Sequence, residues 1–210
     1  MHLIDIISNL SILAPTLLGA VLFTRLDGNL RLLYGLIVGT LVLEGVILYT
    51  SYNGIGNLYL FHVYTFLEFG VISVLYYRLM RMFLFRVILI VTALGFVVFS
   101  LLNLTYWESF SEFNSNQRAV EGVIVLFYLF YYAVYLMQTL ELKNIEKHPY
   151  YWLTIAYVFY FLATFLLFTF SKSLIKENIQ AYWFIHGAFN IFLNTMYAVV
   201  LWIGRKKQTS

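Results

Sequence analysis

Long apolar runs separated by short polar segments form the main pattern along this 210-residue chain. Seven of these runs are each about 20 residues long, the length that an α-helix needs to cross the hydrocarbon core of a bilayer. The pattern therefore predicts an all-α polytopic membrane protein with one transmembrane domain over residues 1–210. The predicted spans are 3–23, 31–51, 57–77, 83–104, 119–140, 150–171 and 180–203.

The polar segments between the runs are short, and none resembles a linker to a second domain. The longest is "TYWESFSEFNSNQR", residues 105–118, between the fourth and fifth predicted spans. The first run lacks a basic start and contains Asp5 and Pro15, so we expect a spanning helix rather than a cleaved signal peptide.

The composition supports a membrane environment for most of the chain. It is 62% hydrophobic and 11% charged, whereas soluble domains are about 45–50% apolar and about 25% charged. A soluble protein of this size could not bury so much apolar surface, so the lipid bilayer is the expected partner. The net charge of +3 comes from basic residues at helix ends and does not indicate nucleic-acid binding. The absence of cysteine excludes disulfides and thiolate metal sites.

Lys and Arg are distributed unequally between the two sets of helix ends, and cytoplasmic loops of membrane proteins are enriched in these residues. The end that carries most of them includes the C-terminus. The sequence therefore predicts a cytoplasmic (inner) membrane protein with its C-terminus inside and its N-terminus outside. Arg118, Lys172 and Lys176 lie at the predicted outer ends; the other ten of the thirteen are Arg25, Arg31, Arg78, Arg81, Arg86, Lys143, Lys147, Arg205, Lys206 and Lys207.

Polar side chains within the predicted spans fall mainly in the outer half of the bilayer. At 1.5 Å per residue, His62 lies roughly 8 Å and Glu68 roughly 16 Å below the outer surface. An ionisable group in the membrane core costs at least about 2.5–3.5 kcal/mol, so such groups normally face the bundle interior or a wet cavity. We expect a polar cavity in the outer half, contacted by Glu44, His62, Tyr64, Glu68, Glu121, His186, Asn190 and Asn194.

The last span carries a polar stripe within "WFIHGAFNIFLN", because His186, Asn190 and Asn194 are spaced i, i+4, i+8. We expect this stripe to face the interior, where it either lines the cavity or forms hydrogen bonds between helices. In the third span, Tyr64 and Glu68 share a helix face. His62 lies about 120° around the helix from Glu68, so the two side chains are expected to point to different places.

The carboxylates differ in their expected surroundings. Glu44 and Glu68 are deep enough to need a partner or a proton, whereas Asp5 and Glu121 are expected near the outer surface, within reach of water. Hydroxyl partners are available from Tyr64, Tyr157, Tyr160 and Tyr197. Gly35 and Gly39 form a GxxxG pattern, which predicts close helix packing within the bundle or in a homodimer.

Three kinds of cofactor chemistry make specific demands on these residues. A retinal Schiff base needs a lysine in the last span, and residues 180–203 contain none. An intramembrane zinc hydrolase of the ceramidase type would need His62, His186 and either Glu44 or Glu68 as ligands. Asn190 stands where that type has a second histidine. Haem held by the two histidines has no other support in the sequence. No cofactor is predicted, and zinc remains an alternative.

A small-solute transporter is another alternative. His62 and His186 lie at nearly the same depth of the third and seventh spans, which would be equivalent in a 3+1+3 arrangement of parallel repeats. The inner halves of the third and fifth spans, "VISVL" and "VLFYLF", are aliphatic and aromatic. They argue against a polar path that reaches the inside.

Four segments, "FHVYTFLEF", "FNS", "YWLTIAYVFYF" and "WFIHGAFNIFLN", together resemble a group of small bacterial seven-span membrane proteins. That group has no assigned activity, and its members often lie near sensor histidine kinases. The resemblance implies a sensory or signalling module, not a reaction. We therefore expect a receptor-like module in which a small ligand, ion or proton enters the outer cavity and a membrane or cytoplasmic partner reads the change in helix packing. A structural membrane subunit remains an alternative.

Overall fold

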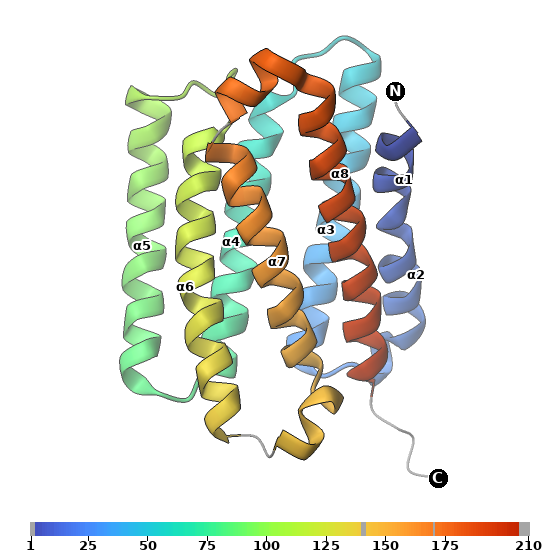
Figure 1. Ribbon diagram of the computed structural model, residues 1–210, viewed down its shortest axis with the longest axis vertical. Helices are drawn as coiled ribbons and strands as arrows, with labels where there is room; N and C mark the ends of the chain where they lie inside the picture. Colours follow the sequence, from blue (N-terminus) through green and yellow to red (C-terminus); the bar gives the residue numbers. More distant parts are fainter. Residues whose placement is uncertain (1–2, 140–141, 170, 206–210) are drawn as a thin grey trace.

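The computed structural model describes residues 3–139, 142–169 and 171–205, which form a helical bundle (Figure 1). Seven helices are long and apolar enough to cross a membrane, which confirms the predicted fold class. The described residues contain no β-strand. Helix α1 begins at one end of the bundle and α8 finishes at the other (Figure 1). These ends are called the N-terminal end and the C-terminal end below.

The first span consists of two helices, α1 (Leu3–Ser11) and α2 (Leu13–Leu22), separated at Ile12 and followed by a 3₁₀ turn, Phe23–Arg25. Pro15 explains the interruption. It has no N–H to donate to the Ser11 carbonyl four residues earlier, and its ring crowds that carbonyl. The region around Ser8 and Ser11, near this interruption of the helix, packs against α8.

The other six spans are single helices, and α6 and α8 start earlier than predicted by the largest margins. Helix α6 begins at Ser115 instead of 119, and α8 begins at Ser171, where a loop up to residue 180 was expected. Both added stretches are polar, so hydropathy could not mark them as helical. The remaining elements are α3 (Gly28–Tyr52), α4 (Leu58–Leu79), α5 (Phe83–Tyr106), η2 (Leu142–Lys147) and α7 (Pro149–Thr169), with α6 ending at Thr139 and α8 at Ile203.

Six of the spans form a ring in chain order. The first span packs against α3, α3 against α4, α4 against α6, α6 against α7, and α7 against α8, which returns to the first span. Helix α5 packs against α4 and α6 at the edge of the bundle (Figure 1). Much of its surface is apolar and exposed, as a lipid-facing helix requires. Spans one to three and five to seven therefore make up the ring, with the fourth outside it.

The interior of the C-terminal half is filled by apolar and aromatic side chains, as the sequence predicted. Tyr76 and Tyr132 are buried, with ring centroids 5.2 Å apart in an edge-to-face arrangement. The Tyr76 hydroxyl lies 3.2 Å from the Thr154 hydroxyl. Phe85 is fully buried beside them and stacks on Tyr131 at 4.2 Å. Aromatic and apolar side chains therefore pack closely in the described part of this half.

Asp27 joins two helices at the C-terminal end. Its carboxylate caps α3 by accepting hydrogen bonds from the N–H groups of Asn29, at 3.0 Å, and Leu30, at 2.8 Å. The Tyr150 hydroxyl, at the start of α7, donates to the same carboxylate at 2.8 Å. Neighbouring His148 is half-buried; burial lowers the pKa of its imidazole, while the Asp27 carboxylate acts in the opposite direction.

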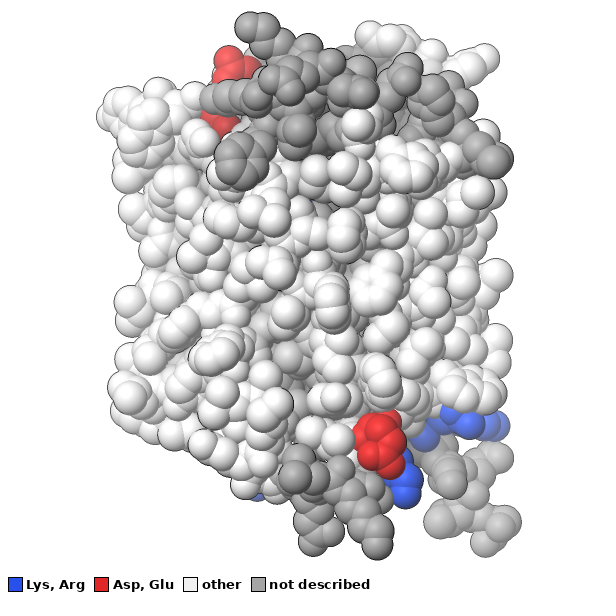
Figure 2. Space-filling view, viewed as in Figure 1, with Lys and Arg blue, Asp and Glu red and all other residues white. Residues whose placement is uncertain are grey.

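The surface agrees with a membrane environment. On the face that Figure 2 shows, an uncharged belt crosses the middle of the molecule, and the Lys and Arg atoms of the described residues that are visible lie at the C-terminal end. The described basic side chains at this end belong to Arg25, Arg31, Arg78, Arg81, Arg86, Lys147 and Arg205. Six residues that entered the predictions of orientation and of carboxylate surroundings have side chains that the structure does not describe. They are Asp5, Lys143, Lys172, Lys176, Lys206 and Lys207.

The GxxxG pair does not mediate close packing within this chain. A Cβ atom at Gly35 would meet no atom within 4 Å, and one at Gly39 would make an ordinary 3.7 Å contact with Leu67. Of the two packing roles predicted for Gly35 and Gly39, close contact between two chains in a homodimer stays a prediction. Small size is needed instead at Gly19, where a Cβ atom would overlap the Tyr34 ring, and at Gly204, where one would overlap the Leu30 side chain.

Candidate functional site

A pocket of about 450 Å³ lies at the N-terminal end, between α1, α3, the start of α4 and α8. Its volume falls within the range of ligand sites, which is about 300–1,000 Å³. Aromatic rings from Phe61, Phe113 and Trp183 form part of its wall. Its polar lining consists of Ser8, Asn9, Glu44, Ser51, Asn57 and His186. We call this cavity the Glu44 pocket.

Glu44 is the one acidic residue among the described residues that line the pocket, and no Lys or Arg is among them. Its side chain projects from α3, half-buried, and lies beside the Asn190 amide of α8. Its Oε2 atom is buried and has no hydrogen-bond partner among the described residues. The carboxyl group of this pocket-lining residue is therefore incompletely satisfied.

His186 contributes to the pocket wall through its ring faces and edges. The imidazole packs edge-to-face against Trp183, at 5.9 Å between centroids, and against Phe168, at 6.1 Å. Gly187, the next residue, lies against α1, because a Cβ atom there would be 3.4 Å from Ile4 and 3.6 Å from Ser8. The start of the apolar part of α8 is thus both pocket wall and packing surface.

The two asparagines of the predicted stripe connect α8 to the interrupted first span. Asn190 Nδ2 donates to Ser8 Oγ at 3.0 Å, and Asn194 Nδ2 donates to Ser11 Oγ at 2.8 Å. Asn194 is buried and lies below the pocket. Of the two predicted roles, hydrogen bonding between helices is what Asn194 performs, while Asn190 also reaches the Glu44 carboxyl.

An aromatic partition separates the Glu44 pocket from the deeper interior. Phe113 stacks on Phe168, with centroids 5.4 Å apart and ring planes at 12°, and meets Trp183 edge-to-face at 6.3 Å. The Arg118 guanidinium carbon lies 5.5 Å from the centroid of Phe168. Phe168 therefore contacts His186 of the pocket wall and Arg118 of a buried charged cluster.

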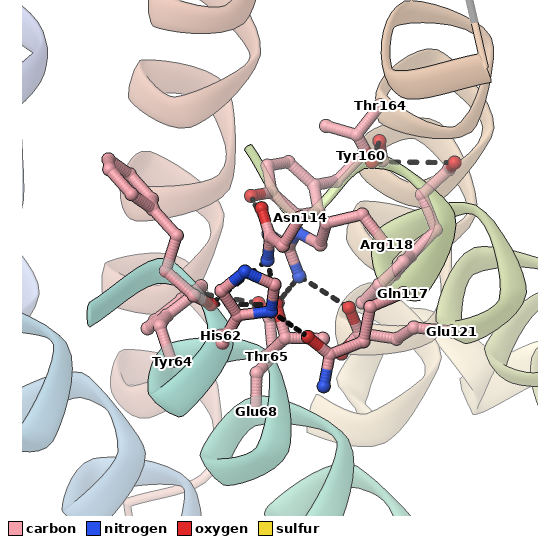
Figure 3. Close-up of polar contacts among 12 residues, drawn as sticks. His62, Tyr64, Thr65, Glu68, Asn114, Gln117, Arg118, Glu121, Tyr160 and Thr164 are labelled. Atoms are coloured by element: carbon pink, nitrogen blue, oxygen red, sulfur yellow. Dashed lines mark hydrogen bonds and ion pairs between the residues drawn. The ribbon is translucent and has the colours of Figure 1, made fainter. Parts of the chain in front are cut away.

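That cluster contains Glu68 of α4 with Arg118 and Glu121 of α6 (Figure 3). Arg118 Nη1 donates to Glu68 Oε2, and also to Glu121 Oε2 at 2.6 Å. The two carboxylate side chains are 0% exposed and the arginine side chain 6%. We call these three residues the Glu68–Arg118–Glu121 triad. The expectations of a solvated Glu121 and of Arg118 at the outer surface were wrong, because the polar first turn of α6 faces the bundle interior.

Tyrosine hydroxyls complete the triad. Tyr64 donates to Glu68 Oε1 at 3.0 Å, which confirms that these two residues share a helix face. Arg118 Nη2 donates to the Tyr160 hydroxyl at 3.2 Å. The guanidinium carbon also lies 5.3 Å from the centroid of the Tyr64 ring, within cation–π range. Tyr197, predicted as a further hydroxyl partner, donates to Tyr157 at 3.3 Å.

His62 belongs to a neighbouring polar layer that also fixes α4 against α6 (Figure 3). Its Nδ1 lies 2.9 Å from Gln117 Oε1, and its Nε2 lies 3.3 Å from the Glu112 carbonyl oxygen. Asn114 Nδ2 donates to Thr65 Oγ1 at 2.7 Å. These contacts agree with the prediction that His62 and Glu68 point to different places.

The loop before α6 is held by Glu108, which sequence reasoning did not single out. Its Oε1 accepts from the backbone N–H of Asn116 at 2.9 Å, in the first turn of α6, where an anion is favoured. Its Oε2 accepts from Asn103 Nδ2 at 2.9 Å. The carboxylate thus joins the end of α5 to the start of α6 and helps to place Gln117 and Arg118.

The alternative zinc site is not assembled. Among the described residues, no three His, Cys, Asp or Glu side chains lie in a group that could hold a metal ion. His62 contacts Gln117, whereas His186 contacts Phe168 and Trp183, so the two histidines have different neighbours. A shell of His62, His186 and one glutamate would require the helices to repack.

Several site residues escaped sequence reasoning for one reason. Asn114, Gln117 and Arg118 belong to the polar segment "NSNQR", which was assigned to a loop. The available signal was the spacing of Gln117, Arg118 and Glu121, which places them along the inner side of a helix that starts at Ser115.

Comparisons with protein-family models, curated proteins and solved structures found no match for this chain. Its site is therefore interpreted from geometry.

Proposed function

We propose that this chain is a receptor-like membrane module that binds a small organic cation in the Glu44 pocket. The observation that carries the proposal is the buried Glu44 Oε2 atom without a partner, within a pocket of about 450 Å³. A carboxylate in this position favours a ligand that supplies a positive charge and a hydrogen-bond donor. The rings of Phe61, Phe113 and Trp183 favour an apolar or aromatic body and attract cations at their faces.

The proposed membrane is the cytoplasmic membrane of a bacterium, with the pocket open to the outside. The basic side chains of the described loops at the C-terminal end support this orientation by the positive-inside rule (Figure 2). The resemblance to small seven-span proteins near sensor histidine kinases fits a membrane or cytoplasmic partner that receives the signal.

Helix α8 is the proposed route of the signal. It carries Trp183 and His186 in the pocket wall and runs to Ile203 at the C-terminal end. Along the way Asn190 and Asn194 tie it to the first span. A ligand that moves Trp183 or Glu44 would change the packing of α8 against the first span. A partner protein would detect this change at the C-terminal end.

The first test compares three compounds that share one aromatic body. Phenethylamine, 2-phenylethanol and phenylacetate differ mainly in charge, and purified protein in lipid nanodiscs would be heated with each. We expect a concentration-dependent rise in melting temperature with the amine only. Glu44→Gln should weaken amine binding at least about tenfold, because charge-assisted hydrogen bonds contribute about 1.5–3 kcal/mol.

The matched control is Glu146→Gln, because Glu146 is exposed at the C-terminal end, far along the bundle from the pocket. This variant should keep the amine response of the wild type. An equal response to the amine and the alcohol, or an unchanged response in Glu44→Gln, would contradict the proposal.

A carrier is the second candidate, favoured by the ring arrangement in which spans one to three and five to seven form the ring and α5 lies outside, as a 3+1+3 arrangement of repeats would require. The close packing of Tyr76, Tyr132 and Phe85 in the C-terminal half favours the receptor instead. Radiolabelled phenethylamine distinguishes the two in proteoliposomes. A receptor retains at most about one molecule per chain, whereas a carrier accumulates or equilibrates the compound across the membrane over time.

A further inference from the structure

The Glu68–Arg118–Glu121 triad has an unbalanced formal charge. Two carboxylates contact the same guanidinium nitrogen, Arg118 Nη1, so the triad carries one net negative charge if both are ionised. All three side chains are buried within the bundle. An uncompensated buried charge is far more costly than a neutral polar group, so a second positive charge or a proton is required.

The described groups around the triad include no second cation in contact with it. The facing hydroxyls are Tyr64 from α4 and Tyr160 from α7, with the pair Tyr157 and Tyr197 beyond them. From α8, His186 lies across the Phe168 ring from Arg118.

The histidine of α4 is also directed elsewhere. Both ring nitrogens of His62 have oxygen partners outside the triad, one from Gln117 and one from the Glu112 carbonyl. The charge of the triad is therefore not neutralised by any described side chain that touches it.

The two carboxylates accept different numbers of hydrogen bonds, and this difference indicates which of them holds the proton. Glu68 accepts at both oxygens, from the Tyr64 hydroxyl at Oε1 and from Arg118 at Oε2. Glu121 accepts from Arg118 at Oε2, while its Oε1 atom is buried and has no partner among the described residues. An ionised carboxylate needs its lone pairs satisfied, so Glu68 suits the charged form and Glu121 the neutral form.

A proton fits this position better than a metal ion. Hard cations such as Ca²⁺ and Mg²⁺ require about six or more oxygen ligands. Glu121 Oε1 has no polar partner within hydrogen-bond distance among the described residues, so no ligand shell surrounds it. A proton needs only this one oxygen, to which it forms an O–H bond.

We propose that the Glu68–Arg118–Glu121 triad is a proton-binding site and that the proton resides on Glu121. Release transfers this proton from Oε1 to water and leaves a carboxylate, and the triad then carries one net negative charge in the bundle interior. That charge favours entry of water or separation of α4 from α6. The site is independent of ligand binding in the Glu44 pocket, since the aromatic partition of Phe113 and Phe168 stands between them.

The test is infrared spectroscopy of the protein in lipid, with ¹³C-labelled glutamate side chains to identify carboxyl bands. At neutral pH the wild type should show a protonated-carboxyl C=O band that persists in Glu44→Gln. Glu121→Gln, made in the Glu44→Gln background so that the Glu44 carboxyl cannot contribute, should remove this band. The matched control Glu108→Gln should retain it, because both oxygens of Glu108 accept hydrogen bonds and suit the ionised form.

Glutamine matches a protonated glutamate in shape and charge, so Glu121→Gln should also keep a near-wild-type melting temperature. Absence of a protonated-carboxyl band in the wild type overturns the proposal without any variant and moves the balancing charge elsewhere, for example to His62. A band that survives in the double variant Glu44→Gln, Glu121→Gln also overturns the assignment. Sodium-dependent stability of the wild type together with no such band would identify a bound alkali cation instead.

Discussion

The guanidinium of Arg118 is fixed by groups from three helices. It contacts Glu68 of α4 and Glu121 of its own helix, and it donates to Tyr160 of α7 at 3.2 Å. Removing the arginine of such a buried set leaves the Glu68 carboxylate without its charged partner, which typically costs about 3–5 kcal/mol. We therefore expect Arg118→Met to lower the stability by about this amount, measured as a fall in melting temperature in detergent.

A control and a rescue separate this effect from general sensitivity to losing arginine. Arg81→Met changes an exposed residue between α4 and α5 and should leave the melting temperature nearly unchanged. The triple variant Arg118→Met, Glu68→Gln, Glu121→Gln removes every charge together and should recover much of the loss, because no buried charge remains unpaired. Equal stabilities of Arg118→Met and Arg81→Met would show that the triad contributes little.

At the scale of helices, two glycines with similar local sequence context are expected to behave differently. Gly19 is buried, and a Cβ atom there would overlap the Tyr34 ring, whose hydroxyl donates to the Thr16 carbonyl at 3.2 Å. Overpacking of this kind usually costs about 1–3 kcal/mol. Gly19→Ala should therefore lower the melting temperature of the purified protein, since either the Tyr34 side chain must shift or the first span must move away from α3.

Gly35→Ala is the matched substitution on α3, where a Cβ atom would meet nothing within 4 Å. It should be neutral or slightly stabilising, because alanine favours a helix over glycine by about 1 kcal/mol. A larger loss at Gly35 than at Gly19 would contradict this packing and would point to a contact between two chains through the GxxxG face.

The spans were predictable because lipid imposes a length and a composition that hydropathy detects directly. Glu44 and His186 were predictable as cavity residues because their depth requires an interior position. Only part of the triad was predictable from the sequence. Glu68 was identified by depth, but Arg118 lies at the end of a span, where an arginine usually faces water, and only the packing of α6 turns it inward. Local sequence does not encode that rotation.

The half of the bundle toward the N-terminal end and the half toward the C-terminal end differ in what fills their interiors. The N-terminal half contains the Glu44 pocket, the aromatic partition and the triad, whereas aromatic and aliphatic side chains fill the C-terminal half. A ligand from the N-terminal end would therefore meet Glu44 and Trp183 first and would reach Arg118 only if Phe168 moved. This order favours a site that reports occupancy over one that conducts a solute through the bundle.

The orientation of the bundle decides which compartment the pocket samples, and the chain is well suited to a direct test because it contains no cysteine. Ser111→Cys introduces one thiol in an exposed loop at the N-terminal end, and Arg81→Cys introduces one in an exposed loop at the C-terminal end. In intact bacterial cells, a membrane-impermeant maleimide should label Ser111→Cys, whereas Arg81→Cys should react only after the membrane is permeabilised. The reverse pattern would contradict the positive-inside argument. The Glu44 pocket would then open to the cytoplasm, and its cation would have to come from inside the cell.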